Sequence, residues 1–269
     1  MTMRDLVDLL NYHTSLYDTG NPKISDKEWD SLYFELQNME KETGICYPDS
    51  PTQKINFNTV SQLNKVEHNH PMLSLDKTKD IDVVKQFLRG QSFVGMFKLD
   101  GLTLSLTYQD GNLVGAETRG NGTVGEDVFH NAQVIPTIPK TIPQKGRVVV
   151  DGEIIIFSSD FEKFSSEYKN PRNFAAGSIR LLSAQECQKR NLTFVAWDLI
   201  ECPNMEELVL KEKNEMNFSD KLIILDHFGF FVVPFFEGDD LDKIINLLQE
   251  YINLTLFPID GYVFKFNNI

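Results

Sequence analysis

The tetrapeptide Lys98-Leu99-Asp100-Gly101 combines residue types that can carry out covalent chemistry. The lysine ends an apolar run, and partial desolvation there favours its neutral, nucleophilic form. The acid can orient a ligand or a metal ion, and the glycine lets the backbone approach that ligand closely. Because so short a pattern recurs by chance, a lysine that merely extends from a strand end into solvent is the alternative interpretation.

Later segments place further charges among apolar or small residues. Asp151-Gly152-Glu153 interrupts runs of valine and isoleucine, where an acid is costly unless it is paired or binds something. Lys265 likewise lies inside an apolar run. Arg172 and Arg180 belong to a segment rich in small residues, where two guanidinium groups can converge on an anion. The alternatives are structural ion pairs and solvated arginines.

The glycine-rich segment 120–125 matches the pattern G-x-G-x-x-G of dinucleotide-binding proteins. That fingerprint requires a β-α-β unit, whereas a hairpin strand precedes these glycines. Prolines occupy the region where the next parallel strand would have to form, at positions 136, 139 and 143. The sequence therefore argues against a Rossmann site. A loop directly after Arg119 can still bring backbone donors and a guanidinium to a phosphate, and a flexible turn is the alternative.

Near the N-terminus, two aromatic residues, an imidazole and two carboxylates are predicted to lie on one helix pair: Tyr12, His13, Asp26, Trp29 and Asp30. Aromatic faces next to acids suit a planar cationic ring such as nicotinamide. An amphipathic helix with a solvated face is the alternative interpretation.

The elements that position these residues follow from periodicity. Apolar residues recur at helical spacing over 3–17, and Ser25 with Glu28 forms a capping box that opens a second helix, for which Gly44 is a plausible end. We predict a helical module over 1–57 and a linker over 58–70.

In the remainder of the chain, residues 71–269, the spacing of apolar residues changes. Strict alternation over 102–108, followed by Asp110-Gly111, predicts a hairpin with a second strand over 112–119. Asp80 can cap a helix that begins at Ile81. Further strands are predicted over 147–157, 192–200, 230–236 and 259–266, and further helices near 158–167, 205–216 and 240–252. Hairpins with scattered helices indicate an α+β domain built on antiparallel sheet.

Composition limits the classes of function. The chain has 269 residues and a formal net charge of −13, which argues against tight nucleic-acid binding by this chain alone. Its three cysteines are far apart, so disulfides and a structural zinc are not expected. No apolar run has the length of a membrane span, and the first residues lack the core of a signal peptide. We expect a cytoplasmic protein that does not bind membranes.

Taken in order, these segments resemble the bacterial-type NAD-dependent DNA ligases over essentially the whole chain. Lys98–Gly101 resembles their nucleophile motif, and the module with Tyr12 and Trp29 is similar to the domain unique to the NAD-using branch. The other matching segments are 71–76, 118–122, 125–127, 152–153, 170–180, Trp197, and Asp260-Gly261 with Lys265. The resemblance implies a small helical N-terminal module followed by a nucleotidyltransferase (ATP-grasp-like ligase) domain with antiparallel sheets.

The resemblance also implies roles for these residues. Lys98 would attack the α-phosphate of NAD, form lysyl-AMP and release nicotinamide mononucleotide. Catalytic roles would fall to Lys98, Asp100, Arg119, Glu153 and Lys265, with Mg²⁺ assisting and Glu153 and Asp100 contacting ribose or ordering the metal's water shell. The cofactor NAD would be bound by Tyr12, His13, Asp26, Trp29, Asp30, Ser74, Leu75, Arg172, Arg180 and Trp197. No residue is expected to ligate a metal directly.

The chain departs from the family pattern at several positions. Met96 stands where an acid is common, Asn121 where an aspartate is usual, and Asp151 where an arginine is common. Trp29 and Trp197 replace tyrosines, which keeps a stacking face.

The resemblance leads us to expect that the family's last lysine-bearing motif lies beyond Ile269, as do its OB fold, zinc module, helix-hairpin-helix domain and BRCT domain. The chain would then be an excised part of a ligase or one subunit of a split ligase. Nicked duplex DNA would be sealed only with such domains or a second subunit. A non-sealing nucleotide-binding or regulatory protein with the same fold is the runner-up, and a dehydrogenase ranks far behind both.

Overall fold

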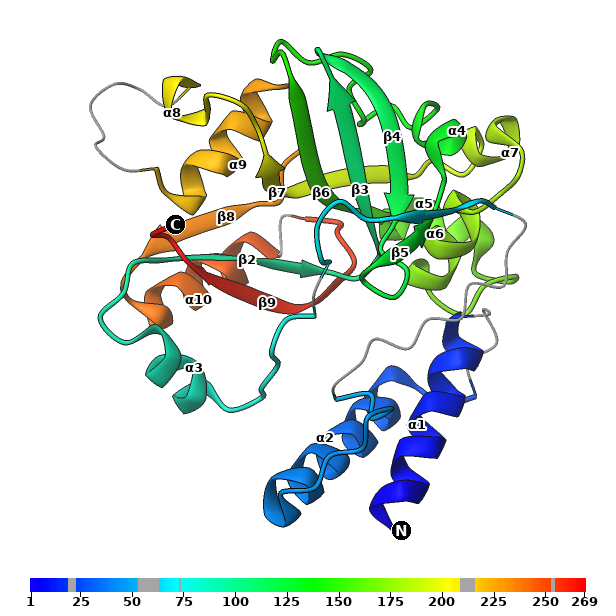
Figure 1. The fold of residues 1–269 in the computed structure, drawn as a ribbon, viewed down its shortest axis with the longest axis vertical. Coiled ribbons are helices and arrows are strands. Elements are labelled where there is room, and N and C mark those ends of the chain that lie inside the picture. Colours follow the sequence, from blue (N-terminus) through cyan, green and yellow to red (C-terminus); the bar gives the residue numbers. More distant parts are fainter. Residues whose placement is uncertain (19–22, 53–62, 73, 209–215, 253–254) are drawn as a thin grey trace. The chain divides into compact units, whose positions relative to one another are not determined.

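The computed structural model describes residues 1–18, 23–52, 63–72, 74–208, 216–252 and 255–269 (Figure 1). Within this part, the chain divides into two compact units. One comprises 1–75 with 119–126, and the other comprises 76–118 with 127–269. Among the described residues, no helix is both long enough and apolar enough to cross a membrane.

The first unit begins with a pair of helices, α1 (Met3–Asp18) and α2 (Asp26–Thr43). The predicted capping box is confirmed, because Ser25 and Glu28 bond reciprocally at the start of α2. Gly44 ends α2 with φ of 68°, a left-handed conformation that glycine adopts at little cost. The helices pack through a core of Met3, Leu6, Val7, Leu10 and Leu36. Each such side chain contributes on the order of 1.5–3 kcal/mol on burial.

The same unit contains a short antiparallel pair, β1 (Lys65–Glu67) with β5 (Val124–Glu126). The sequence did not predict either strand, because three residues are too few to show a period of two. β1 therefore lies inside the stretch 58–70 that was expected to be a linker.

The second unit contains a four-stranded sheet in the order β4-β3-β6-β7. Its strands are β3 (Leu102–Gln109), β4 (Asn112–Thr118), β6 (Arg147–Ile155) and β7 (Thr193–Glu201). The predicted hairpin between β3 and β4 is confirmed: Asp110 and Gly111 both have positive φ, 50° and 88°, as a type I′ turn requires.

A three-stranded sheet in the order β8-β2-β9 completes this unit (Figure 1). Its central strand is β2 (Phe93–Leu99), between β8 (Phe235–Gly238) and β9 (Ile259–Phe266). The strand predicted over 230–236 begins later, at Phe235. Pro234 cannot donate to a ladder, and the residues before it follow β7 through one isolated bridge, Ala196 with Val232.

Helices α3 (Ile81–Leu88) and α10 (Leu241–Ile252) agree with the prediction, and Asp80 caps α3. The helix predicted over 158–167 is instead α5 (Ser158–Phe161) with a 3₁₀ turn over Glu162–Phe164. α8 (Met205–Leu208) begins the helix predicted near 205–216, and residues 209–215 lie outside the described part. The sequence missed α4 (Phe129–Ala132), α6 (Pro171–Ile179), α7 (Ala184–Gln188) and α9 (Phe218–His227).

The missed helices share a physical cause. α4 and α7 are about one turn long, which gives no period to detect. α6 contains Ala175, Ala176 and Gly177, whose small side chains give little periodic signal. α9 buries residues around most of its circumference, so its apolar positions form no single stripe. The predicted class is nevertheless confirmed, because helices combine with sheets whose described strand pairings are all antiparallel.

Candidate active site

Lys98 lies near the end of β2, opposite Gly261 of β9, where the register of the two strands shifts. Its ammonium forms an ion pair with the Asp260 carboxylate. The Lys98 side chain is 42% exposed, so it is partly desolvated, as expected from the sequence. Burial favours the neutral form of Asp260, but the hydrogen bond and charge of Lys98, with the charges of Arg172 and Lys77, outweigh it and lower the pKa of Asp260.

The residues after Lys98 tie the β2 end to two other segments. The Asp100 amide donates to the Pro258 carbonyl at 2.8 Å, just before β9. The Asp100 carboxylate lies 3.5 Å from the Arg172 guanidinium in the first turn of α6. A Cβ on Gly101 would lie 2.2 Å from the Ile154 carbonyl oxygen, so this glycine is required for close packing of β3 on β6. Gly101 was expected to let the backbone approach a ligand, and the structure shows that it lets two strands approach each other.

Glu153 lies on β6 directly opposite Thr103 of β3, whose hydroxyl donates to the Glu153 carboxylate at 3.1 Å. Two residues earlier, Asp151 is buried opposite Ser105 on one side and Asp198 on the other. Polar side chains therefore continue across one face of β3, β6 and β7. An acid inside an apolar sheet is costly unless it is paired, as noted for residues 151–153, and the same holds for the buried Asp198.

Lys265 of β9 forms an ion pair with Asp198. Its ammonium lies 2.7 Å from Asp198, and Lys221 of α9 lies 3.4 Å from the other oxygen of the same carboxylate. The Lys265 ammonium also lies 4.6 Å from the ring centre of Phe218 and 5.3 Å from that of Trp197. Sequence reasoning missed Lys221 and Asp198; an acid inside the apolar run of β7 was the signal for Asp198.

Trp197 owes its placement to a bulge in β7. Ala196 pairs with Gly152 and Asp198 pairs with Asp151, so Trp197 is the additional residue between two register positions. Bulges re-aim side chains and are frequent near functional sites.

Arg172 and Arg180 lie at opposite ends of α6, in its first turn and at its C-cap. Eight residues of helix separate their Cα atoms by about 12 Å. The sequence predicts that both guanidinium groups can converge on one anion. Because the backbone holds the two residues apart, only their long side chains could bring the groups together.

Arg119, Ser74 and Leu75 belong to the other unit. The Arg119 guanidinium donates to the Ser74 hydroxyl at 2.9 Å, and the His68 ring contacts the Arg119 carbonyl at 2.8 Å. Leu75 is exposed. Gly120 has φ of 53°, and a Cβ there would lie 1.9 Å from the Val124 carbonyl oxygen, so the glycine-rich segment is a tight turn into β5.

In the helix pair, Tyr12 is 55% exposed and lies edge-on to the His13 ring. The Nδ1 atom of His13 is buried and has no hydrogen-bond partner among the described residues. Trp29 stacks on Tyr33 at 5.2 Å and its indole donates to Thr14 at 3.2 Å. Asp26 and Asp30 lie in the first turns of α2, and their side chains are outside the described part of the structure.

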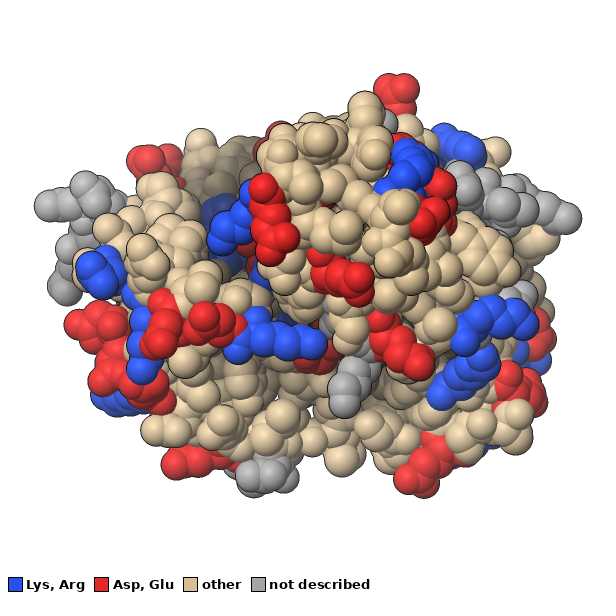
Figure 2. Space-filling model, turned by 90° about the horizontal axis from the view of Figure 1, so that it is seen from below, with Lys and Arg blue, Asp and Glu red and all other residues tan. Residues whose placement is uncertain are grey.

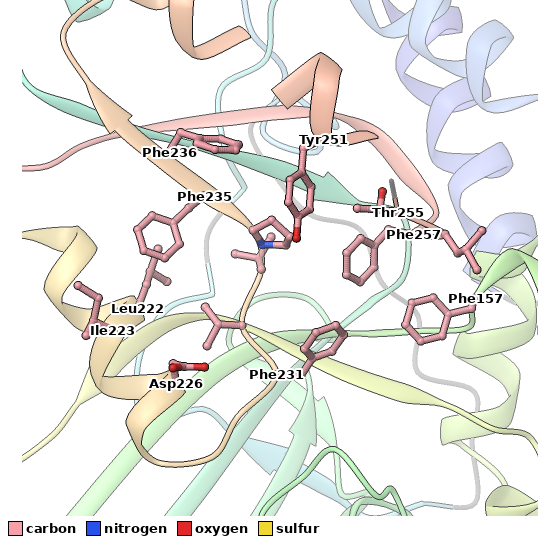
Figure 3. A pocket seen from close by; sticks show the side chains of 14 residues that line it. Phe157, Leu222, Ile223, Asp226, Phe231, Phe235, Phe236, Tyr251, Thr255 and Phe257 are labelled. Carbon is pink, nitrogen blue, oxygen red and sulfur yellow. The ribbon is translucent and has the colours of Figure 1, made fainter. Parts of the chain in front are cut away.

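A pocket of about 640 Å³ lies in the second unit between α9, the segment before β8 and the end of α10 (Figure 3). Its wall is mainly aromatic and aliphatic and includes Phe231, Phe257 and Tyr251, and Asp226 is the charged residue among its described lining residues (Figure 3). None of the predicted site residues whose side chains the structure describes lines it. Its location is therefore distinct from the chemistry gathered around Lys98 and Lys265.

Surface charge agrees with the acidic composition. On the face drawn in Figure 2, basic and acidic side chains of the described residues are interspersed rather than gathered into one basic surface. Counterion release from a nucleic-acid backbone needs clustered Lys and Arg, which this face does not offer.

Comparison with known proteins assigns this fold and site to a class. Residues 60–269 match the family model of the NAD-dependent DNA ligase adenylation domain, and residues 1–56 match that of the DNA ligase-like, N-terminal NAD⁺-binding domain. The chain belongs to the NAD-dependent DNA ligase family.

Curated relatives agree with this assignment. The chain is 39% identical over 277 residues to a DNA ligase of Ruminiclostridium cellulolyticum and 37% identical over 274 residues to one of Lachnoclostridium phytofermentans. The matches cover 99% and 98% of this chain but 41% of each relative. A solved structure, mycobacterial DNA ligase D complexed with ATP and MES, matches 74% of this chain and 55% of its own at 15% identity, with a TM-score of 0.39, too low to carry an argument.

Proposed function

We propose that this chain carries out the adenylation half-reaction of an NAD-dependent DNA ligase, with Lys98 as the nucleophile. The observation that carries the proposal is the contact of Lys98 with Asp260, two residues 162 positions apart in the sequence. A lysine at a strand end, in contact with a carboxylate and within reach of solvent, has both a route for the substrate and a group that can take its proton.

In the proposed step, the neutral Lys98 amine attacks the α-phosphate of NAD. A phosphorus–nitrogen bond forms, the phosphoanhydride bond to nicotinamide mononucleotide breaks, and that nucleotide leaves with the bridging oxygen. The lysine must first give up a proton, and the Asp260 carboxylate that contacts it is proposed to accept this proton and pass it to solvent, to which its side chain is 48% exposed. Lys265, Arg119 and Arg172 are proposed to stabilise the negative charge that develops on the phosphates.

Asp100 and Glu153 are proposed to contact ribose or to order water around Mg²⁺. Among the described residues, no group of three or more His, Cys, Asp or Glu side chains could hold a metal ion. Mg²⁺ is usually bound through one or two carboxylates, water and substrate phosphates, so the proposal relies on Asp100, Glu153 and the phosphates of NAD. When bound, the ion would neutralise phosphate charge and make phosphorus more electrophilic.

The remaining predicted residues are proposed to hold NAD. Trp197 would stack on adenine, and Ser74, Leu75 and Arg180 would line the AMP portion. The helix pair would take the nicotinamide nucleotide through Tyr12, His13, Asp26, Trp29 and Asp30. The buried Nδ1 of His13, which has no partner in the described part of the chain, supports this role, because a buried polar atom without a partner is costly until a ligand satisfies it.

AMP is proposed to pass from Lys98 to the 5′-phosphate of a nick in duplex DNA. This transfer is proposed to require DNA-binding domains or a second ligase subunit. The chain spans less than half the length of the curated relatives it matches, so sealing activity belongs to this proposal. We propose that the reaction takes place in the cytoplasm and that the domain boundaries lie at 57/58 and 70/71.

The proposal is tested by incubating the full chain with NAD and Mg²⁺ and measuring its mass and the released nucleotide. We expect one AMP adduct, located on Lys98 by peptide mass spectrometry, and one equivalent of nicotinamide mononucleotide. Lys98→Arg should form no adduct, while Lys85→Arg, in an exposed ion pair with Asp242, should behave like the parent. Bound NAD without an adduct, even after the relatives' additional domains are supplied, would instead support a non-sealing nucleotide-binding protein.

A further inference from the structure

Lys265 is held by more contacts than a phosphate-binding lysine on a strand needs. Its ammonium is in contact with Asp198 of β7 at 2.7 Å, and aromatic rings of Trp197 and Phe218 lie within 5.3 Å. A lysine side chain is long and flexible, so holding its end at one place carries an entropic cost. Three groups that share this task indicate that the position of the ammonium matters.

The carboxylate that holds Lys265 is itself held. One Asp198 oxygen contacts Lys265 and the other contacts Lys221, which comes from α9. The exposed fractions of the Asp198, Lys221 and Lys265 side chains are 11%, 16% and 25%, so solvent screens these contacts less than it screens a surface pair. Since α9 packs against β7 (Figure 1), Lys221 fixes the carboxylate from a rigid element.

We infer that Asp198 is a positioning residue for Lys265 and that Lys221 acts through Asp198 by fixing the orientation of its carboxylate. Asp198 does not touch the nucleotide in this inference; it holds the Lys265 ammonium where charge develops on the phosphate. Preorganised charge accelerates a reaction because it need not be reoriented during the step. The inference rests on the proposed adenylation function, and it assigns roles to two residues outside the predicted site.

The first test measures single-turnover formation of lysyl-AMP at a series of NAD concentrations. For Asp198→Asn, whose amide keeps the size but lacks the charge, we expect the rate constant to fall about 10- to 100-fold, as for a displaced catalytic group. The half-saturating NAD concentration should change less than about threefold, because the lost contact acts in the transition state. Asp198→Glu, which restores the charge, should show a smaller loss than Asp198→Asn.

A double-mutant cycle tests the order of the contacts. Lys221→Met alone should lower the rate constant about 3- to 10-fold, and Asp198→Asn with Lys221→Met should equal Asp198→Asn within about twofold. If Lys221 were only a structural residue of α9, the two losses would multiply and the inference would be overturned. Asp226→Asn is the matched control: this carboxylate also lies on α9 but lines the apolar pocket, and its variant should keep the parent rate.

A second readout does not depend on catalysis. The rate at which an amine-specific reagent modifies Lys265 at one fixed pH, relative to exposed Lys189, should rise at least about threefold in Asp198→Asn and stay unchanged in Asp226→Asn. An unchanged rate in Asp198→Asn would overturn the inference even if the parent forms lysyl-AMP. A parent chain that forms no adduct, with the expected rise in modification, would overturn the proposed function and leave Asp198 as the residue that positions Lys265.

Discussion

The two regions that carry the candidate residues are built differently. Around Lys98 and Lys265, three candidate charges meet an opposite charge from a distant segment: Lys98 meets Asp260, Arg172 meets Asp100, and Lys265 meets Asp198. In the helix pair, the candidate residues come from two consecutive helices and meet mainly rings and hydroxyl groups. In the first region the candidate residues form ion pairs between distant segments, and in the second they present aromatic rings.

The two regions differ in whether a structural contact and a proposed functional role fall on the same residue. In the ion-paired region, a structural contact and a proposed catalytic role coincide, because Lys98 and Lys265 are both held by carboxylates. In the helix pair the two can be separated. Tyr12 is exposed and contributes little to packing, whereas Trp29 stacks on Tyr33 and packs against the core of the pair.

The largest expected effect in this comparison is on Asp260. We expect Asp260→Asn to lower the rate of lysyl-AMP formation about 100-fold, since the amide cannot accept the Lys98 proton. Asp242→Asn removes the acid of an exposed lysine pair in the same unit and is the matched control. Equal rates for both variants in a quenched-flow assay would contradict the role given to Asp260.

Trp29→Ala should act on stability. Truncation of a large, partly buried aromatic side chain costs about 2–4 kcal/mol here, toward the low end for buried aromatics because Trp29 keeps some exposure. Hydrogen exchange should show lost protection in α1 and α2 while the four-stranded sheet keeps its protection. Unchanged exchange in α1 would show that Trp29 is not part of the helix-pair core.

Tyr12→Ala should act on substrate use. We expect about a tenfold loss both in adenylation by NAD and in its reversal by nicotinamide mononucleotide, the size of an aromatic contact to a cationic ring. The melting temperature should not change, and Tyr12→Phe, which keeps the ring, should retain most activity. A variant that loses the forward reaction but keeps the reversal would be inconsistent with a nicotinamide site at Tyr12.

The smallest expected effect is the pH dependence of stability. The folded-state pKa of Asp260 is lowered, so its ion pair stabilises the fold above pH ~4 and this contribution is lost as the pH falls through the lowered pKa. The side chain is 48% exposed, so solvent screening limits the contribution to less than about 1 kcal/mol. Urea unfolding of parent and Asp260→Asn should differ at pH 6, and the difference should shrink as the pH falls through the lowered pKa of Asp260; a constant difference would refute this assignment.

The comparison also separates what local sequence predicts from what it misses. The capping box of α2, the turn at Asp110-Gly111 and the position of Lys98 at a strand end all follow from short-range rules. The strand placed at 230–236 and the helices α6 and α9 do not, because packing partners far along the chain decide them.

The sequence by itself determined the order of the motifs, the antiparallel α+β class and the types of the reactive residues, since periodicity and side-chain chemistry are local properties. Only the tertiary structure decided which charges meet. Lys98 finds Asp260, and Lys265 finds Asp198 and through it Lys221, because strand pairing and helix packing join segments that no spacing rule connects. Ion pairs depend on distance in space, and that distance exists only after the sheets have formed.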